Sequence, residues 1–333
     1  MKFPHWMHLE SLVYGFLSIS LFSCNTEPKE ITENKELPEK AIEAHSAPDT
    51  SSIPDNPEGV MIRYGRELIF NTAKLIGPNG SAGKYLGNKM NCTNCHLDGG
   101  TRPFGFNFFS TYSIYPQYRS RENAVLTIEQ RVNNCIERPH NGIPLPLDSK
   151  EMVAFVSYIK WLGTDVPIGS KVSGSGGITL EYPERAADPV KGKAIYQREC
   201  VTCHLEDGSG TWTSDSSTFT YPPLWGENSY QPGSSMFRII KAAQFIKANM
   251  PFGTAFWDKP KLSDEEALDV AAYINSSEHF RPSKGGADYK DIRTKYVDYP
   301  FGPYDDPFSE AQHKLGPFQP IIDYRKANKL YLK

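Results

Sequence analysis

Two pentapeptides with one shared pattern constrain this chain more than any other feature of its sequence. Residues 92–96 read Cys-Thr-Asn-Cys-His, and residues 200–204 read Cys-Val-Thr-Cys-His. In a C-x-x-C-H segment both thiols form thioethers with the vinyl groups of a haem, and the histidine binds the iron. Disulfides, or a zinc site built from both cysteine pairs, do not explain a histidine after each second cysteine. The sequence therefore predicts two covalently bound haem c groups. The residues expected to hold them are Cys92, Cys95, His96, Cys200, Cys203 and His204.

Length and charge limit the other possibilities. The chain has 333 residues, which at roughly 150 residues per domain is enough for two domains. Its 36 Lys and Arg residues stand against 39 Asp and Glu residues, so the formal net charge is -3. A nucleic-acid-binding protein that relies on bulk positive charge is therefore excluded.

The N-terminus has the features of an export signal. Lys2 precedes an apolar run from Leu12 to Phe22, which is too short for the ~20 residues of a membrane-spanning helix. The run ends in Leu-Phe-Ser-Cys, which resembles a bacterial lipobox with Cys24 as the lipidated residue. An ordinary cleaved signal peptide is the alternative. We therefore expect a lipid-anchored protein on the periplasmic side of a bacterial membrane.

Composition divides the rest of the chain. Residues 25–57 contain eight Asp or Glu, three Lys and five Pro, and such a segment buries too little apolar surface to fold. Each haem segment should lie in a small, all-helical cytochrome c fold. The predicted organisation is a signal peptide (1–23), a disordered tether (24–57), cytochrome c domain 1 with the active-site haem (58–165), a linker (166–185), cytochrome c domain 2 with the electron-transfer haem (186–281) and an extended C-terminal arm (282–333).

An internal repeat relates the two domains. Asp148 and Glu151, like Ser263 and Glu266, have the spacing of a helix capping box, and each predicted helix then carries Tyr-Ile at an offset of 115 residues. The same offset aligns Cys135 with Met250. A Met-Pro pair often supplies the second axial ligand of a c-type haem. The register therefore predicts that Met250 binds the second iron and that Cys135 faces the first.

Cysteine counting agrees with this register. Six cysteines, less four for the haems and one for the lipid, leave Cys135 alone. The alternatives are that Cys135 is a small buried apolar residue, and that His140, Met152 or no residue binds the first iron. Met236 and Lys247 compete with Met250 at the second. A thiolate ligand would lower the potential of the first haem, which suits chemistry, whereas a His/Met haem suits electron relay.

Arginines are concentrated around Cys135. Five of the thirteen in the chain lie between residues 102 and 138, and Arg131 precedes Cys135 by one helical turn. Guanidinium groups bind oxyanions and would favour a thiolate. A solvated face, or partners for haem propionates, is the alternative.

With these residues in hand, the chain resembles the dihaem thiosulfate dehydrogenase and tetrathionate reductase family of bacterial c-type cytochromes. The resemblance covers roughly residues 59–322. The motifs that carry it, besides the first haem segment, are Tyr-Arg-Ser-Arg at 118–121, Arg-Val-Asn-Asn-Cys-Ile-Glu-Arg at 131–138, Asn-Gly-Ile-Pro-Leu-Pro at 141–146, Tyr-Pro-Pro-Leu-Trp-Gly at 221–226, Asn-Met-Pro at 249–251 and Gln-His-Lys-Leu-Gly-Pro-Phe at 312–318.

The resemblance implies a reaction and a set of roles. Family members join two thiosulfate ions into tetrathionate with release of two electrons, and some run the reverse. Their active haem has a His/Cys axial pair, which maps onto His96 and Cys135, and their substrate-binding arginines match Arg121 and Arg131. The implied mechanism has Cys135 forming a sulfur-sulfur bond with one thiosulfate, which a second thiosulfate then attacks. A small cytochrome or a quinone-linked complex would be the redox partner.

The sequence departs from the family at Pro139 and His140, where relatives carry a serine and a methionine. This leaves the substrate contacts and the preferred direction open. Two rival interpretations also remain. One is a membrane-tethered dihaem electron carrier without its own substrate, in which Cys135 is structural. The other is a haem subunit of a sulfur-oxidising complex, which needs a partner protein for turnover.

Overall fold

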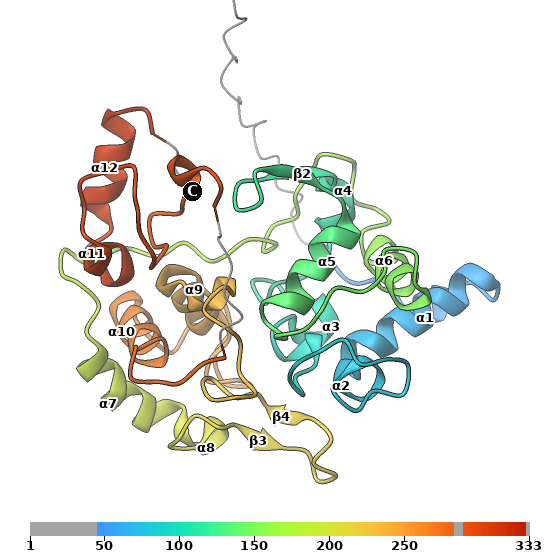
Figure 1. Ribbon diagram of the computed structural model, residues 1–333. Coiled ribbons are helices and arrows are strands. Elements are labelled where there is room, and N and C mark those ends of the chain that lie inside the picture. Colours follow the sequence, from blue (N-terminus) through green and yellow to red (C-terminus); the bar gives the residue numbers. More distant parts are fainter. Residues whose placement is uncertain (1–44, 283–288, 331–333) are drawn as a thin grey trace, which may run out of the picture. The chain divides into compact units, whose positions relative to one another are not determined.

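Helices dominate the computed structural model, which describes residues 45–282 and 289–330 (Figure 1). The predicted signal peptide, Cys24 and most of the predicted tether lie outside the described residues. Among the described residues, no helix has the length and apolar character that crossing a membrane requires.

The first unit, from residue 50 to residue 162, is mainly helical with one short hairpin. Its elements are α1 (Pro57–Phe70), α2 (Thr72–Ile76), α3 (Leu97–Gly100), α4 (Thr111–Ile114), β1 (Gln117–Arg119), β2 (Ala124–Leu126), α5 (Ile128–Glu137) and α6 (Lys150–Leu162), with 3-10 helices at Thr50–Ser52 and Cys92–Asn94. Strands β1 and β2 pair antiparallel, with Tyr118 opposite Val125.

The second unit, residues 186–281, repeats this plan. Its elements are α7 (Pro189–Glu199), α8 (Val201–His204), β3 (Thr211–Trp212), β4 (Phe219–Tyr221), a 3-10 helix (Ser235–Phe237), α9 (Ile239–Asn249) and α10 (Asp264–Ile274). Strands β3 and β4 pair antiparallel across a bulge. The C-terminal segment adds a 3-10 helix (Ile292–Thr294), α11 (Glu310–Leu315) and α12 (Gln319–Ala327).

A close helix crossing supports the repeat in both units. Helix α1 packs on α6, and α7 packs on α10 (Figure 1). At Gly65 a Cβ atom would overlap the carbonyl oxygen of Ala154, and at Gly192 it would overlap that of Asp269. Ala154 and Asp269 are 115 residues apart, which is the offset that the sequence predicts. Glycine is needed at both crossings because the helix backbones approach too closely for a side chain.

The helix starts agree with the predicted caps, with one shift. The Ser263 side chain accepts from Glu266 N and the Glu266 side chain accepts from Ser263 N, so the capping box of α10 is confirmed. For α6 the prediction of Asp148 as the cap is wrong by one residue, because Ser149 accepts from Met152 N. Either residue type caps a helix well, so sequence alone does not choose between neighbours.

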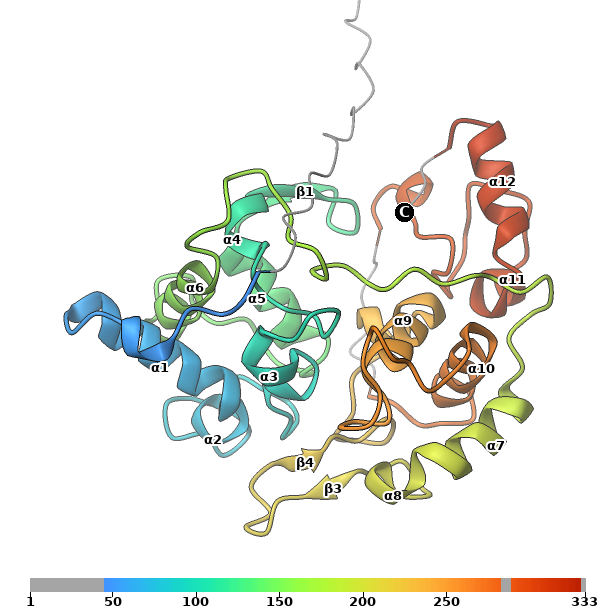
Figure 2. The ribbon, with the colours of Figure 1, turned by 180° about the vertical axis from the view of Figure 1, so that it is seen from behind.

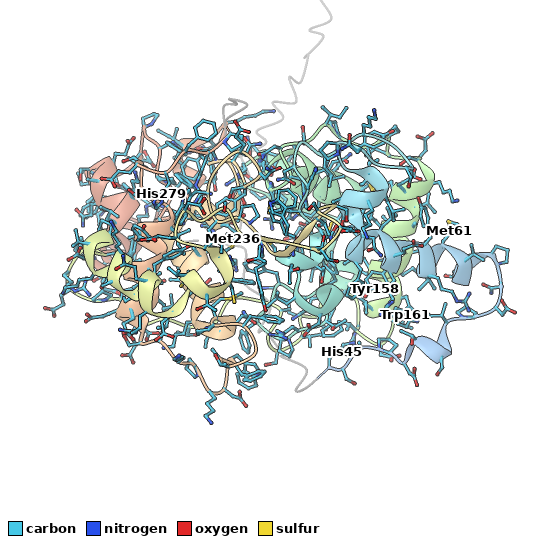
Figure 3. All side chains as sticks on the ribbon, turned by 90° about the horizontal axis from the view of Figure 1, so that it is seen from below. His45, Met61, Tyr158, Trp161, Met236 and His279 are labelled. Atoms are coloured by element: carbon cyan, nitrogen blue, oxygen red, sulfur yellow. The ribbon has the colours of Figure 1, made fainter. Side chains whose placement is uncertain are left out.

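The segments that were expected to be extended or disordered have ordered contacts. His45 Nε2 lies 3.1 Å from Leu162 O, and its ring meets Phe109 edge-on (Figure 3). Ile53, which is 6% exposed, joins the core of the first unit. The prediction of a disordered tether is therefore wrong for residues 45–57, because these two side chains have partners on the folded body.

The linker and the C-terminal segment contact both units. Figure 2 shows the linker between α6 and α7, and Val172 and Leu180 on it are buried. Tyr289 N donates to Arg121 O at 3.1 Å in the first unit. Ala187 N, at the start of the second unit, donates to Leu315 O at 2.7 Å. The C-terminal arm, predicted as extended, includes two short helices.

Candidate active site

A cavity of about 620 Å³ lies beside the first pentapeptide, and the residues that the pentapeptide and the repeat single out line it. Cys92, Cys95 and His96 line it from the segment that joins α2 to α3. Arg131 and Cys135 line it from α5. A cavity of this size suits a cofactor or a drug-sized ligand.

The histidine of each pentapeptide is held in the same way. His96 Nδ1 lies 2.6 Å from Phe106 O, and His204 Nδ1 lies 2.8 Å from Pro222 O. A carbonyl oxygen only accepts, so Nδ1 carries the proton in both rings and Nε2 keeps its lone pair. An Nδ1–H to carbonyl bond commonly orients a metal-binding histidine. In both rings Nε2 is therefore the nitrogen available to bind iron.

Helix α5 positions Cys135 beside a cation. Its start is fixed by a capping box in which Thr127 accepts from Gln130 N and the Gln130 side chain accepts from Thr127 N. One turn separates Arg131 from Cys135, and Arg131 Nη1 donates to Cys135 Sγ at 2.9 Å. The helical spacing that the sequence predicts thus brings the guanidinium onto the sulfur.

The cysteines have opposite electrostatic environments. Burial raises the pKa of Cys92, Cys95 and Cys200 to about 12. Burial also acts on Cys135, but the charge of Arg131 and the contact with His96 outweigh it and lower the pKa to about 6. Cys135 therefore has the character of a thiolate near neutral pH, which is the nucleophilic form of the residue.

The two arginines chosen from the sequence have different contacts. Both line the first cavity, but only Arg131 contacts Cys135. Arg121 donates to Gly233 O, and its guanidinium lies 5.6 Å from the ring centre of Tyr289 and 5.9 Å from that of Tyr299. Arg121 therefore also joins the first unit to the second unit and the C-terminal segment.

Met152 and His140, the other candidate ligands of the first iron, have different surroundings. Met152 is fully buried in the hydrophobic core of the first unit. His140 lines the cavity, with Nε2 3.9 Å from Cys92 Sγ and Nδ1 3.3 Å from Asn88 Oδ1. Burial, together with the charge of His96, lowers the pKa of His140 to about 4, so the ring is neutral at pH 7.

A second cavity of about 300 Å³ lies beside the other pentapeptide. Cys200, Cys203 and His204 line it together with Met250, which ends α9. The rival Lys247 instead forms an ion pair with Asp264. The other rival, Met236, which is labelled in Figure 3, lines both cavities.

Several apolar side chains form the wall that the two cavities share. Met90, Tyr230 and Met236 line both, and they pack into one buried cluster with Phe219 and Phe237. The Tyr230 hydroxyl donates to Asn275 Oδ1 at 3.0 Å, which satisfies its polar end. Asn91 and Cys95 line both cavities as well, so the two sites share one wall.

The residues present fit haem c at both sites. The five described cysteines are free thiols, as thioether formation requires. Each pair lies beside a histidine whose Nδ1 is occupied by a carbonyl and whose ring lines a cavity. Among residues 45–282 and 289–330, no group of three or more His, Cys, Asp and Glu gathers as a metal site.

Sequence reasoning missed part of the first cavity. Arg238 and Lys241, around the start of α9, line it from the second unit, and Tyr296 and Asp298 line it from the C-terminal segment. No motif links these residues to Cys135, because they reach the cavity only through the docking of separate parts of the chain.

Family models match both units. Residues 84–168 match the cytochrome c domain of the SoxA/TsdA type, and residues 189–278 match the general cytochrome c domain. The chain thus has two cytochrome c domains in tandem, and the predicted fold class is confirmed.

Relatives that match most of the chain identify the family within this class. A thiosulfate dehydrogenase of Thiomonas intermedia is 35% identical over 77% of this chain and 78% of its own, and one of Psychrobacter arcticus is 38% identical over 72% and 69%. The solved thiosulfate dehydrogenase (TsdBA) of Marichromatium purpuratum superposes with a TM-score of 0.64 at 34% identity, covering 69% of this chain and 48% of that longer one. The chain belongs to the thiosulfate dehydrogenase family of oxidoreductases.

Proposed function

We propose that this protein is a dihaem oxidoreductase that couples two thiosulfate ions to tetrathionate with release of two electrons, or runs the reverse. The observation that carries the proposal is the contact between Arg131 Nη1 and Cys135 Sγ, 2.9 Å long, in the cavity that His96 also lines. A thiol that serves only packing does not need a buried cation. The names of the relatives supply the substrate class.

The residues that hold the cofactors follow from the two cavities. In this proposal Cys92 and Cys95 attach one haem c, and Cys200 and Cys203 attach the other. The residues that bind the two irons are His96 with Cys135 and His204 with Met250. Each haem accepts one electron, so the pair can take both electrons of the oxidation.

The sulfur chemistry balances in two steps. The Cys135 thiolate and the terminal sulfur of one thiosulfate form a sulfur-sulfur bond, which releases two electrons and leaves a sulfonate-ended adduct on Cys135. The terminal sulfur of a second thiosulfate attacks the adduct sulfur bonded to Cys135 Sγ. This bond breaks, tetrathionate leaves and the thiolate returns. Arg131 stabilises the thiolate at both ends of the cycle, because its charge favours the ionised sulfur.

The cellular setting remains part of the proposal. Export, lipidation of Cys24 and a periplasmic location follow from the N-terminal sequence. The electrons would leave from the second haem, because Met250 and His204 give it the ligands of an electron-relay site. A small cytochrome or a quinone-linked complex is the acceptor proposed.

Turnover by the purified full chain with both haems tests the function. Thiosulfate is offered with ferricyanide as the acceptor, and tetrathionate with a reduced viologen as the donor. We expect turnover in at least one direction, with loss in Cys135→Met although haem content stays at two per chain. A wild-type protein that exchanges electrons but converts neither compound would be the electron carrier. Turnover that appears only with an added partner protein would indicate the sulfur-oxidising subunit.

A further inference from the structure

Two cations of the second unit lie on the wall of the first cavity and have no role in the chemistry above. Arg238 is the N-cap residue of α9, and Lys241 lies in its first turn. Both line the cavity that Arg131 and Cys135 line from the opposite domain. Their placement depends on the contact between units, so it is specific to the assembled two-domain protein.

Arg238 is nearly buried and only partly satisfied. It is 9% exposed, its Nη1 donates to Asp298 Oδ1 at 2.9 Å, and its guanidinium stacks 3.7 Å from the ring centre of Tyr296. Its Nε has no hydrogen-bond partner within the described part of the chain. Buried polar groups without partners are rare, and each indicates a ligand, a water or an ion.

Lys241 has fewer polar partners than Arg238. Its Nζ lies 4.9 Å from the ring centre of Phe106, and within the described residues it makes no hydrogen bond or ion pair. Burial lowers the pKa of Lys241 to about 8, assisted by the charges of Arg238 and Arg131. The nearby acid, Asp298, already binds Arg238 Nη1 and Ile240 N. Two cations therefore face one carboxylate on this side of the cavity, and that carboxylate is already engaged.

We propose that Arg238 and Lys241 form an oxyanion-binding site on the first cavity, opposite the Arg131 and Cys135 pair. This inference rests on the proposed function and extends it to a second anion. The ligand chemistry is a sulfonate or carboxylate that accepts from the Lys241 ammonium and lies beside the charge of the Arg238 guanidinium, since both residues line the cavity. The anion has two possible sources, which are the sulfonate end of a substrate molecule and a propionate of the first haem.

Lys241 is the residue to change, because Arg238 also supports Asp298 and its loss would disturb folding. Lys241→Gln removes the charge, and Lys241→Arg retains it. Lys193→Gln is the matched control, since Lys193 is an exposed lysine on α7 outside the lining of both cavities. All three are compared with the wild type as full-length protein with both haems.

If the anion is a substrate sulfonate, Lys241→Gln raises KM for thiosulfate by about 10-fold or more, the effect of one lost charged hydrogen bond. The kcat stays within about twofold, inhibition by inert sulfate weakens in parallel, and Lys241→Arg restores most of the affinity. If the anion is a propionate, KM is unchanged and the midpoint potential of the first haem falls, because loss of a nearby cation favours ferric iron.

The site is refuted if Lys241→Gln matches Lys193→Gln in KM, in sulfate inhibition and in the first haem potential. Failure of the proposed function looks different, because wild-type protein would then show no turnover. In that case calorimetric binding of thiosulfate and the haem potential still decide the site. A change in either the thiosulfate affinity or the first haem potential in Lys241→Gln relative to Lys193→Gln supports it, and equality in both contradicts it.

Discussion

The two cavities of this protein have one scaffold and opposite chemistry. In both units a long helix crosses another at a glycine, and the pentapeptide histidine donates from Nδ1 to a carbonyl. At the equivalent position, however, the first unit has Cys135 beside a guanidinium and the second has Met250. The repeat therefore fixes a position on the cavity wall, and the residue type at that position decides its chemistry.

The lining of the cavities extends this contrast. Arg131, Arg238 and Lys241 contribute positive charge to the first cavity. In the second unit Lys247, one turn before Met250, is turned to an ion pair with Asp264. A cationic cavity attracts anions and stabilises a thiolate, whereas an apolar one suits electron relay. The difference in charge thus follows the difference in proposed role.

The largest expected effect concerns a buried ion network in the C-terminal segment, which contacts Val297 on the lining of the first cavity. Asp306 accepts from Arg325 Nε at 2.9 Å and lies 2.9 Å from His313 Nε2, all fully buried, while His313 Nδ1 donates to Val297 O. Asp306→Asn removes the buried carboxylate charge that Arg325 and His313 contact, so we expect the free energy of unfolding to fall by about 3 kcal/mol. Denaturant unfolding at pH 7 measures this. Glu58→Gln, in an exposed pair with Lys160, should cost less than about 1 kcal/mol.

The same variant has a pH signature. Burial alone would raise the pKa of Asp306, but the hydrogen bonds from His313 and Arg325 outweigh it and hold the pKa below its usual range. A lowered folded-state pKa contributes stability above the unfolded-state value of about 3.9 and loses it as the pH falls through the folded value. Wild-type stability should therefore decline below pH ~4 more steeply than that of Asp306→Asn. Parallel curves would contradict this assignment.

The next effect separates the cavities directly. Arg131→Gln removes the charged hydrogen bond to Cys135, which is worth about 1.5–3 kcal/mol, so kcat/KM should fall by roughly 10- to 100-fold. Arg131→Lys should lose less. The potential of the second haem should not change in either variant. Arg198→Gln, on the exposed face of α7, is the charge-matched control. Equal kcat/KM in Arg131→Gln and Arg198→Gln would remove Arg131 from the mechanism.

The smallest effect compares the two repeated helices. Ser149→Ala removes one cap bond from α6, and Ser263→Ala breaks the reciprocal capping box of α10. Each should lower the free energy of unfolding by about 1 kcal/mol, with the larger loss at Ser263. Denaturant unfolding of the two variants measures the difference. A larger loss of unfolding free energy in Ser149→Ala than in Ser263→Ala would show that the second hydrogen bond of the capping box does not stabilise α10.

What the sequence could predict depended on local patterns. The offset of 115 residues predicted that α6 and α10 are equivalent helices, and the four-residue spacing placed Arg131 one turn from Cys135. Iron ligation by Cys135 and Met250 stays a prediction. Local patterns work here because a helix and its cap are decided within a few residues.

The rest depended on contacts between distant segments. Arg238, Lys241 and Asp298 reach the first cavity because α9 and the C-terminal segment dock beside it. The contacts of residues 45–57 have the same origin. His45 lies beside Leu162, which is 117 residues away, and Ile53 packs into the core of the first unit. Contacts between distant segments leave no periodic pattern in the sequence, so sequence patterns do not predict them.

The central claim is that the two sites differ in the sulfur that faces the iron. Low-temperature electron paramagnetic resonance of the fully oxidised protein tests it most directly, with Cys135→Met as the reference. We expect one low-spin ferric signal of the thiolate type and one of the His/Met type, with only the thiolate signal lost in Cys135→Met. Two signals of the His/Met type in the wild type, unchanged by Cys135→Met, would contradict it.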